Sequence, residues 1–124
     1  MGITVLLADD SEIVRRAITD LLKSDPEIEM LAECDSFRQT LEVAAKLRPQ
    51  VIVLDVHMGD ERAVTPSQLK SSLNGSCMLA ISIWKDNETK AFAESIGAVE
   101  LLDKANLASL LIPAIRRCVI DRPA

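Results

Sequence analysis

Residues 51–55 read Val51-Ile52-Val53-Leu54-Asp55, four aliphatic residues followed by an acid. Such an unbroken apolar run predicts a central strand of a parallel sheet, because a strand of that kind is covered on both faces. A second run, Ile3 to Ala8, has the same character and leads into Asp9-Asp10. Both runs therefore predict buried strands that end in carboxylates.

Segments of strand and helix character alternate on either side of these two runs. Three more strands are expected at about residues 28–32, 77–83 and 99–102, with helices at about 11–25, 36–47, 65–74, 87–96 and 107–119. Ser11, Ser36 and Thr65 are the candidate capping residues of the first three helices, and prolines and glycines mark helix ends. Because Pro113 lies within the last apolar pattern, we expect that helix to start late, near Leu110, or to kink. The alternation predicts one α/β domain over residues 1–124, a doubly wound, three-layer parallel sheet with five strands and five helices.

Composition excludes several functional classes. A net charge of -5, with scattered basic residues, argues against nucleic-acid binding by this chain. No apolar run is long enough to span a bilayer, and the first residues show no secretory signal, so we expect a cytoplasmic protein without membrane contact. Cys34, Cys77 and Cys118 are widely spaced and lack metal-ligand spacing, which predicts reduced, mostly packed thiols.

Polar residues follow successive predicted strands. Asp9-Asp10 follows the first strand, Asp55 ends the third, Ser82 lies near the end of the fourth and Lys104 lies just beyond the fifth. The carboxyl ends of parallel strands share one edge of the sheet, so these side chains are expected to meet there. Three clustered carboxylates repel one another unless a cation lies between them or their pKa values rise. The pattern therefore predicts a hard divalent cation, Mg²⁺ or Mn²⁺.

With these residues in place, the chain resembles the receiver domains of two-component response regulators over essentially its whole length. The resemblance is carried by the ordered set Ala8-Asp9-Asp10-Ser11, Leu54-Asp55-Val56-His57-Met58, Ile81-Ser82 and Gly97-Ala98 with Leu102-Asp103-Lys104. The last interval is most similar to receivers that precede LuxR-type DNA-binding domains. The resemblance implies a CheY-like, flavodoxin-like sheet of order 2-1-3-4-5, and a role in two-component signal transduction and transcription regulation.

The resemblance also implies a role for each site residue. Asp55 would be the phosphoacceptor, which attacks phosphorus to form an acyl phosphate. Asp9, Asp10, Asp55 and the backbone carbonyl of His57 would hold the metal, while the His57 ring is expected to be an exposed substituent. Lys104 and the Ser82 hydroxyl would stabilise the phosphoryl oxygens.

The implied partners are a sensor histidine kinase or a phosphotransfer protein, and a phosphorylation-dependent homodimer. We expect a signalling switch that assists its own phosphorylation and dephosphorylation, and not an enzyme.

Three of the positions that depart from the receiver pattern bear on whether the chain is phosphorylated. Gly59 stands where proline is usual, which predicts a looser loop, and Leu101 replaces the aromatic residue that often switches rotamer. Ala105 follows Lys104 where a cis-proline is common, so we expect a trans peptide bond there. These departures keep open a phosphorylation-independent adaptor as the alternative function. A small Mg-dependent aspartate phosphohydrolase is a further rival, disfavoured because the short loops leave little room for a substrate.

Overall fold

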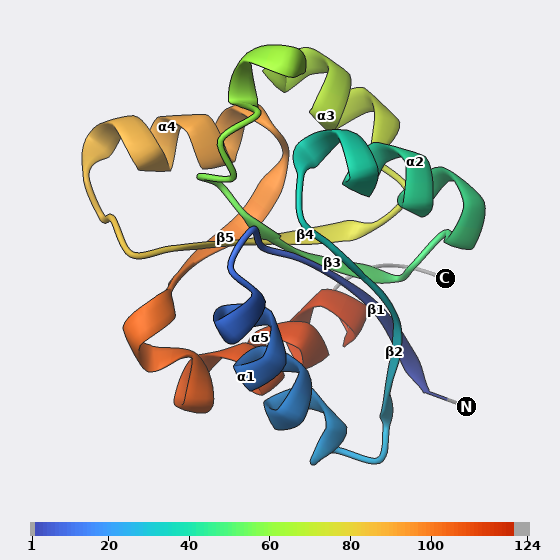
Figure 1. The fold of residues 1–124 in the computed structure, drawn as a ribbon. Coiled ribbons are helices and arrows are strands. Elements are labelled where there is room, and N and C mark those ends of the chain that lie inside the picture. Colours follow the sequence, from blue (N-terminus) through green and yellow to red (C-terminus); the bar gives the residue numbers. More distant parts are fainter. Residues whose placement is uncertain (1, 121–124) are drawn as a thin grey trace.

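The computed structural model describes residues 2–120, and its centre is a sheet of five parallel strands (Figure 1). The strands are β1 (Ile3–Ala8), β2 (Ile28–Cys34), β3 (Val51–Asp55), β4 (Cys77–Ser82) and β5 (Ala98–Asp103). They lie in the order β2-β1-β3-β4-β5, and every neighbouring pair is parallel. The strand order therefore reverses between β1 and β3, which confirms the doubly wound, flavodoxin-like fold expected from the sequence.

Helices cover both faces of the sheet. They are α1 (Glu12–Lys23), α2 (Phe37–Leu47), α3 (Pro66–Ser72), α4 (Asn87–Ser95) and α5 (Leu107–Ile120), with short 3₁₀ helices at Glu61–Ala63 (η1) and Lys104–Asn106 (η2). In Figure 1, α1 and α5 lie on one face, and α2, α3 and α4 lie on the other. Within residues 2–120, no helix is both long and apolar enough to cross a bilayer.

The positions of β1 and β3 in the centre of the sheet explain why residues 5–8 and 51–54 are apolar throughout. Every residue of β3 and β4 is buried. Along β3, Val51 and Val53 pack into the core under α1 and α5, whereas Ile52 and Leu54 pack into the core under α2, α3 and α4. Because successive side chains point to opposite faces, a strand between two helical layers needs apolar residues at every position.

Three helices begin at the predicted capping residues. The hydroxyls of Ser11, Ser36 and Thr65 each accept a hydrogen bond from the backbone N–H three residues later, at 3.3, 3.0 and 3.0 Å. These bonds satisfy N–H groups that have no partner inside the helix. The caps thus fix the residues at which α1, α2 and α3 begin.

The start of α5 corrects the sequence prediction. The helix begins at Leu107, so a late start near Leu110 is wrong, and it continues through Pro113. Proline has no N–H to donate to the Ser109 carbonyl. Both Pro113 and Ser109 are exposed, so water can bind that carbonyl. The buried side, which includes Leu111 and Ile115, keeps its contacts with the sheet.

The cysteines also differ from the sequence prediction. Cys77 at the start of β4 and Cys118 in α5 form a disulfide, with their Cα atoms 5.8 Å apart, so the expectation of reduced thiols is wrong for this pair. The two residues are 41 positions apart in the sequence, and only the packing of α5 on β4 brings them together. Cys34 is a free, buried thiol, as expected, and burial raises its pKa to about 11.

Candidate functional site

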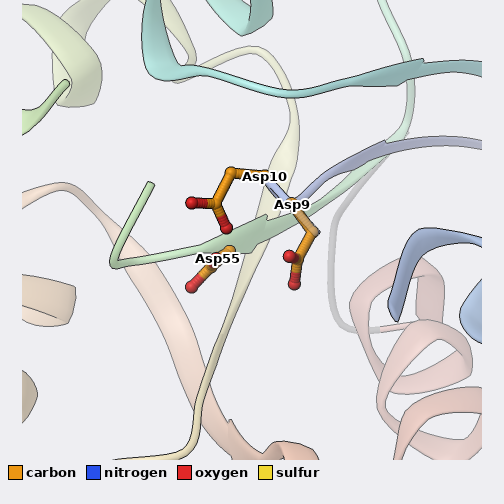
Figure 2. Close-up of side chains that lie close together, drawn as sticks. All are labelled: Asp9, Asp10 and Asp55. Atoms are coloured by element: carbon orange, nitrogen blue, oxygen red, sulfur yellow. The ribbon is translucent and has the colours of Figure 1, made fainter. Parts of the chain in front are cut away.

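The three predicted carboxylates meet at the carboxyl edge of the sheet (Figure 2). Ala8 and Leu54 are partners in the β1–β3 ladder, so Asp9 and Asp55 follow at the same level. One carboxylate oxygen from each of Asp9, Asp10 and Asp55 lies within 4.8 Å of the other two. Asp9 and Asp55 are 0% and 2% exposed, whereas Asp10 is open to solvent. The cluster thus has two buried acids and one that faces water.

Lys104 reaches this cluster from the 3₁₀ helix that follows β5. Its Nζ lies 2.7 Å from Oδ2 of Asp9 and 3.3 Å from Oδ2 of Asp55, and its side chain is 15% exposed. A single cation therefore bridges the two buried carboxylates. One Lys cannot neutralise three acids, so the cluster retains excess negative charge.

The environment of Asp55 raises its pKa to about 6. Burial is the main cause, because it penalises the charged carboxylate, and the nearby Asp9 charge adds to the rise. The His57 backbone N–H, 3.0 Å from Oδ1, and the Lys104 ammonium both lower the pKa and offset part of this effect. Without a metal, Asp55 consequently titrates close to neutral pH.

Ser82 lies at the end of β4, next to the strand that carries Asp55, and is buried. Its Oγ accepts a hydrogen bond from the Trp84 backbone N–H at 2.9 Å. In the described part of the chain, its hydroxyl donates to no protein group. The proton is available to a ligand that binds at the strand ends.

The His57 ring lies beside α4 and is exposed, as the sequence predicted. Its Nε2 is 3.5 Å from Oγ1 of Thr89 in that helix. The backbone of His57 is held differently, through its N–H to Asp55. The predicted role of the His57 carbonyl as a metal ligand stays a prediction.

Asp60 is a positioning residue that sequence reasoning missed. Its carboxylate accepts hydrogen bonds from the backbone N–H groups of Phe37 and Arg38, at 3.0 and 3.1 Å. This caps α2 and anchors the loop after β3, where the sequence had suggested a looser segment. Gly59 has a φ of +92°, which proline cannot adopt. No sequence motif marks Asp60, because its partners lie 22 and 23 residues away.

Leu101 and Ala105, two residues that depart from the receiver pattern, lie in β5 and in the 3₁₀ helix that follows it. Leu101 is partly buried and packs against the core under α2, α3 and α4. No peptide bond within residues 2–120 is cis, so the bond between Lys104 and Ala105 is trans, as predicted. The Asp103 side chain accepts from the Ala105 N–H at 2.9 Å and holds this turn.

The fold and the site together define an α/β domain with a candidate cation site at the switch point of its sheet. The sequence profile of the response regulator receiver domain matches residues 5–116. The chain therefore belongs to the response regulator receiver family.

Similar proteins fall into two groups. The chain is 32% identical to a protein-glutamate methylesterase/protein-glutamine glutaminase of Shewanella frigidimarina over 106 residues, 84% of this chain and 27% of that protein. It is 39% identical over 62 residues, 50% of this chain and 29% of that protein, to the DNA-binding transcriptional activator DevR/DosR of Mycobacterium tuberculosis. The chain thus spans about a quarter to a third of the length of these relatives.

Solved structures of other receiver domains show the same fold. The response regulator domain of Thermotoga maritima CheB superposes with a TM-score of 0.84 at 22% identity, covering 99% of this chain and 100% of that one. The receiver domain of the putative regulator NarL from Mycobacterium tuberculosis gives 0.85 at 21% identity, covering 98% of each chain. At these identities the likeness establishes the fold.

The comparisons overturn one expectation from the sequence. We expected a switch and not an enzyme, but several of the matched relatives are named as methylesterases and glutaminases, which are enzymes. The matched region is only part of those proteins.

Proposed function

We propose that residues 1–124 are a phosphoacceptor receiver domain in which Asp55 takes a phosphoryl group from a sensor histidine kinase or phosphotransfer protein of the cytoplasm. The observation that carries the proposal is the Lys104 ammonium, which bridges the buried carboxylates of Asp9 and Asp55. A buried cation beside a buried acid at the carboxyl edge of the sheet is suited to hold a phosphoryl group.

The donor set fits Mg²⁺ or Mn²⁺. Asp9, Asp10 and Asp55 offer hard oxygen ligands within 4.8 Å of one another, and the exposed Asp10 leaves a side open to water. The His57 carbonyl would complete the protein ligands. When bound, the metal would supply positive charge against the oxygens of the incoming phosphoryl group.

The protein residues have separate tasks in the transfer. The ionised Asp55 carboxylate attacks phosphorus in line; the new P–O bond forms as the P–N bond to the donor histidine breaks, and the bonding electron pair leaves with the imidazole. Lys104 favours the ionised form of Asp55 and pairs with phosphoryl oxygens once the carboxylate has become an acyl phosphate. The Ser82 hydroxyl donates a hydrogen bond to another phosphoryl oxygen.

We predict that beryllofluoride with Mg²⁺, a phosphoryl mimic, raises the melting temperature of the chain by several degrees. A ligand that binds the native state at about thirty times its Kd stabilises it by about 2 kcal/mol. Thermal melts of the wild-type and Asp55→Asn proteins, each with Mg²⁺ alone and with Mg²⁺ plus beryllofluoride, measure the effect. The variant should show no rise from beryllofluoride. A wild-type melt that the mimic does not move would instead favour the phosphorylation-independent adaptor.

A further inference from the structure

A groove of about 420 Å³ opens beside the site, between the loop after β3 and the first turns of α4. Its apolar lining comes from Val56, Trp84 and Phe92. Three carboxylate side chains, Glu61, Asp86 and Glu88, also line it. Trp84 and Asp86, which line it, belong to the segment between β4 and α4, and Figure 1 shows the course of that segment. None of the phosphoryl-transfer steps described above uses these six side chains.

The apolar side of the groove is firm and accessible. Val56 is buried, and Phe92 is partly buried against the core, with its ring edge-on to Phe37 at a centroid distance of 6.2 Å. Trp84 remains 56% exposed, although its backbone is fixed through the hydrogen bond to Ser82. Tryptophans that are open to solvent often anchor protein interfaces.

The charged side of the groove has one sign. Glu61, Asp86 and Glu88 face it, and no lysine or arginine is among its lining residues. Asp86 accepts a hydrogen bond from the Thr89 hydroxyl, which holds the pKa of Asp86 below its usual range and keeps it ionised. The three carboxylates make the groove attractive to cations and repellent to anions.

The groove on the other side of α4 has a different character. It shares Trp84 with the first groove, but it is lined by Lys85 and Lys90 as well as by Glu94 and Asp103. Lys85 and Asp103 form an ion pair at 2.7 Å, so part of this charge is already neutralised within the domain. Acidic side chains without a lysine or arginine beside them therefore distinguish the first groove, lined by Val56, His57, Glu61, Trp84, Asp86, Glu88, Thr89 and Phe92, which we call the Trp84 groove.

We propose that the Trp84 groove docks a segment of a partner protein that presents a large apolar side chain flanked by lysine or arginine. The apolar side chain packs on Trp84, Val56 and Phe92, which removes exposed aromatic surface from water. The cations pair with Glu61, Asp86 and Glu88, and an arginine also stacks on the Trp84 ring. The proposal does not depend on phosphorylation of Asp55.

The test uses a dye-labelled peptide of sequence Arg-Lys-Leu-Phe-Lys-Arg with blocked ends, and the full chain at low salt. Fluorescence anisotropy is expected to show saturable binding, which Trp84→Ala weakens by about tenfold or more. Glu88→Gln should weaken it several-fold, and Glu94→Gln, on α4 but in the other groove, is the matched control that should not. Because the chain has one Trp and no Tyr, unlabelled peptide should also change its intrinsic emission.

Two altered peptides test whether binding needs both the apolar side chains and the positive charges. Serine in place of Leu and Phe, or glutamate in place of every cation, should abolish saturable binding. Absence of binding by the original peptide, or equal binding by the wild-type, Glu88→Gln and Glu94→Gln proteins, would overturn the proposal. So would self-association of the chain that Trp84→Ala abolishes, because a second copy would then be the occupant.

Discussion

Lys104→Ala is expected to lower the free energy of unfolding by about 3–5 kcal/mol at pH 7 in a chelator, because it leaves two buried carboxylates without their cation. Lys104 is the bridge between Asp9 and Asp55, which are 0% and 3% exposed at their side chains. Urea unfolding followed by circular dichroism measures the loss. Added Mg²⁺ should recover part of it, since the metal would supply the missing positive charge.

Lys85→Ala is the matched control. Lys85 also pairs with a carboxylate at the carboxyl end of β5, that of Asp103, but its side chain is 68% exposed. Exposed pairs of this kind contribute about 0–1 kcal/mol. Equal losses in the two variants would contradict the assignment of Lys104 as the cation of a buried site. A Lys104→Ala defect that does not shrink on acidification from pH 7 toward pH 5 would also contradict it, because protonation of Asp55 relieves the uncompensated charge.

Asp55→Asn is expected to stabilise the metal-free chain by about 2–3 kcal/mol at pH 7, because burial raises the pKa of Asp55 and the ionised carboxylate therefore destabilises the folded state. Burial raises the pKa of Asp55 from 3.8 to about 6, so the folded state binds its proton more tightly than the unfolded state. The tighter proton binding of Asp55 in the folded state contributes to the free energy of unfolding. This contribution is fully present below pH 3.8 and is lost as the pH rises through 6. Urea unfolding in a chelator across this range gives the measurement.

The advantage of the Asn variant should therefore fade as the pH falls from 7 to 4. Asp10→Asn removes an acid of the same cluster that is exposed, and should change stability much less. With Mg²⁺ the wild-type chain should gain more stability than Asp55→Asn, since the variant lacks one predicted ligand. If Asp55→Asn were less stable than wild type at pH 7 in a chelator, the claim that the buried, ionised Asp55 carboxylate destabilises the fold would be wrong.

The fold could be predicted where one local rule decided the structure. Residues 5–8 and 51–54 are apolar at every position because two helical layers cover them, and hydroxyl caps set three helix starts. Features that depend on distant packing were missed. The Cys77–Cys118 disulfide requires α5 to lie on β4, and the Asp60 cap requires two loops to meet. Pro113 misled the prediction because an exposed carbonyl tolerates the missing bond.

The candidate site was predicted more completely than the rest. Parallel strands place their ends at one edge, so Asp9, Asp10 and Asp55 had to converge once the strands were identified. The exact partners of Lys104 depend on the turn after β5, which no motif specifies. The expectation that the protein is not an enzyme failed for another reason. It rested on the chemistry of one domain, whereas the relatives named as enzymes are three to four times longer than the matched segment.

Covalent phosphorylation of Asp55 tests the central claim most directly. The chain is incubated with Mg²⁺ and phosphoramidate, whose P–N bond resembles that of phosphohistidine, and its intact mass is recorded alongside that of Asp55→Asn. We predict that the wild-type chain gains the mass of one phosphoryl group, that the gain requires Mg²⁺, and that the variant gains none. No gain in the wild-type chain, or an equal gain in the variant, would contradict the assignment of Asp55 as the phosphoacceptor.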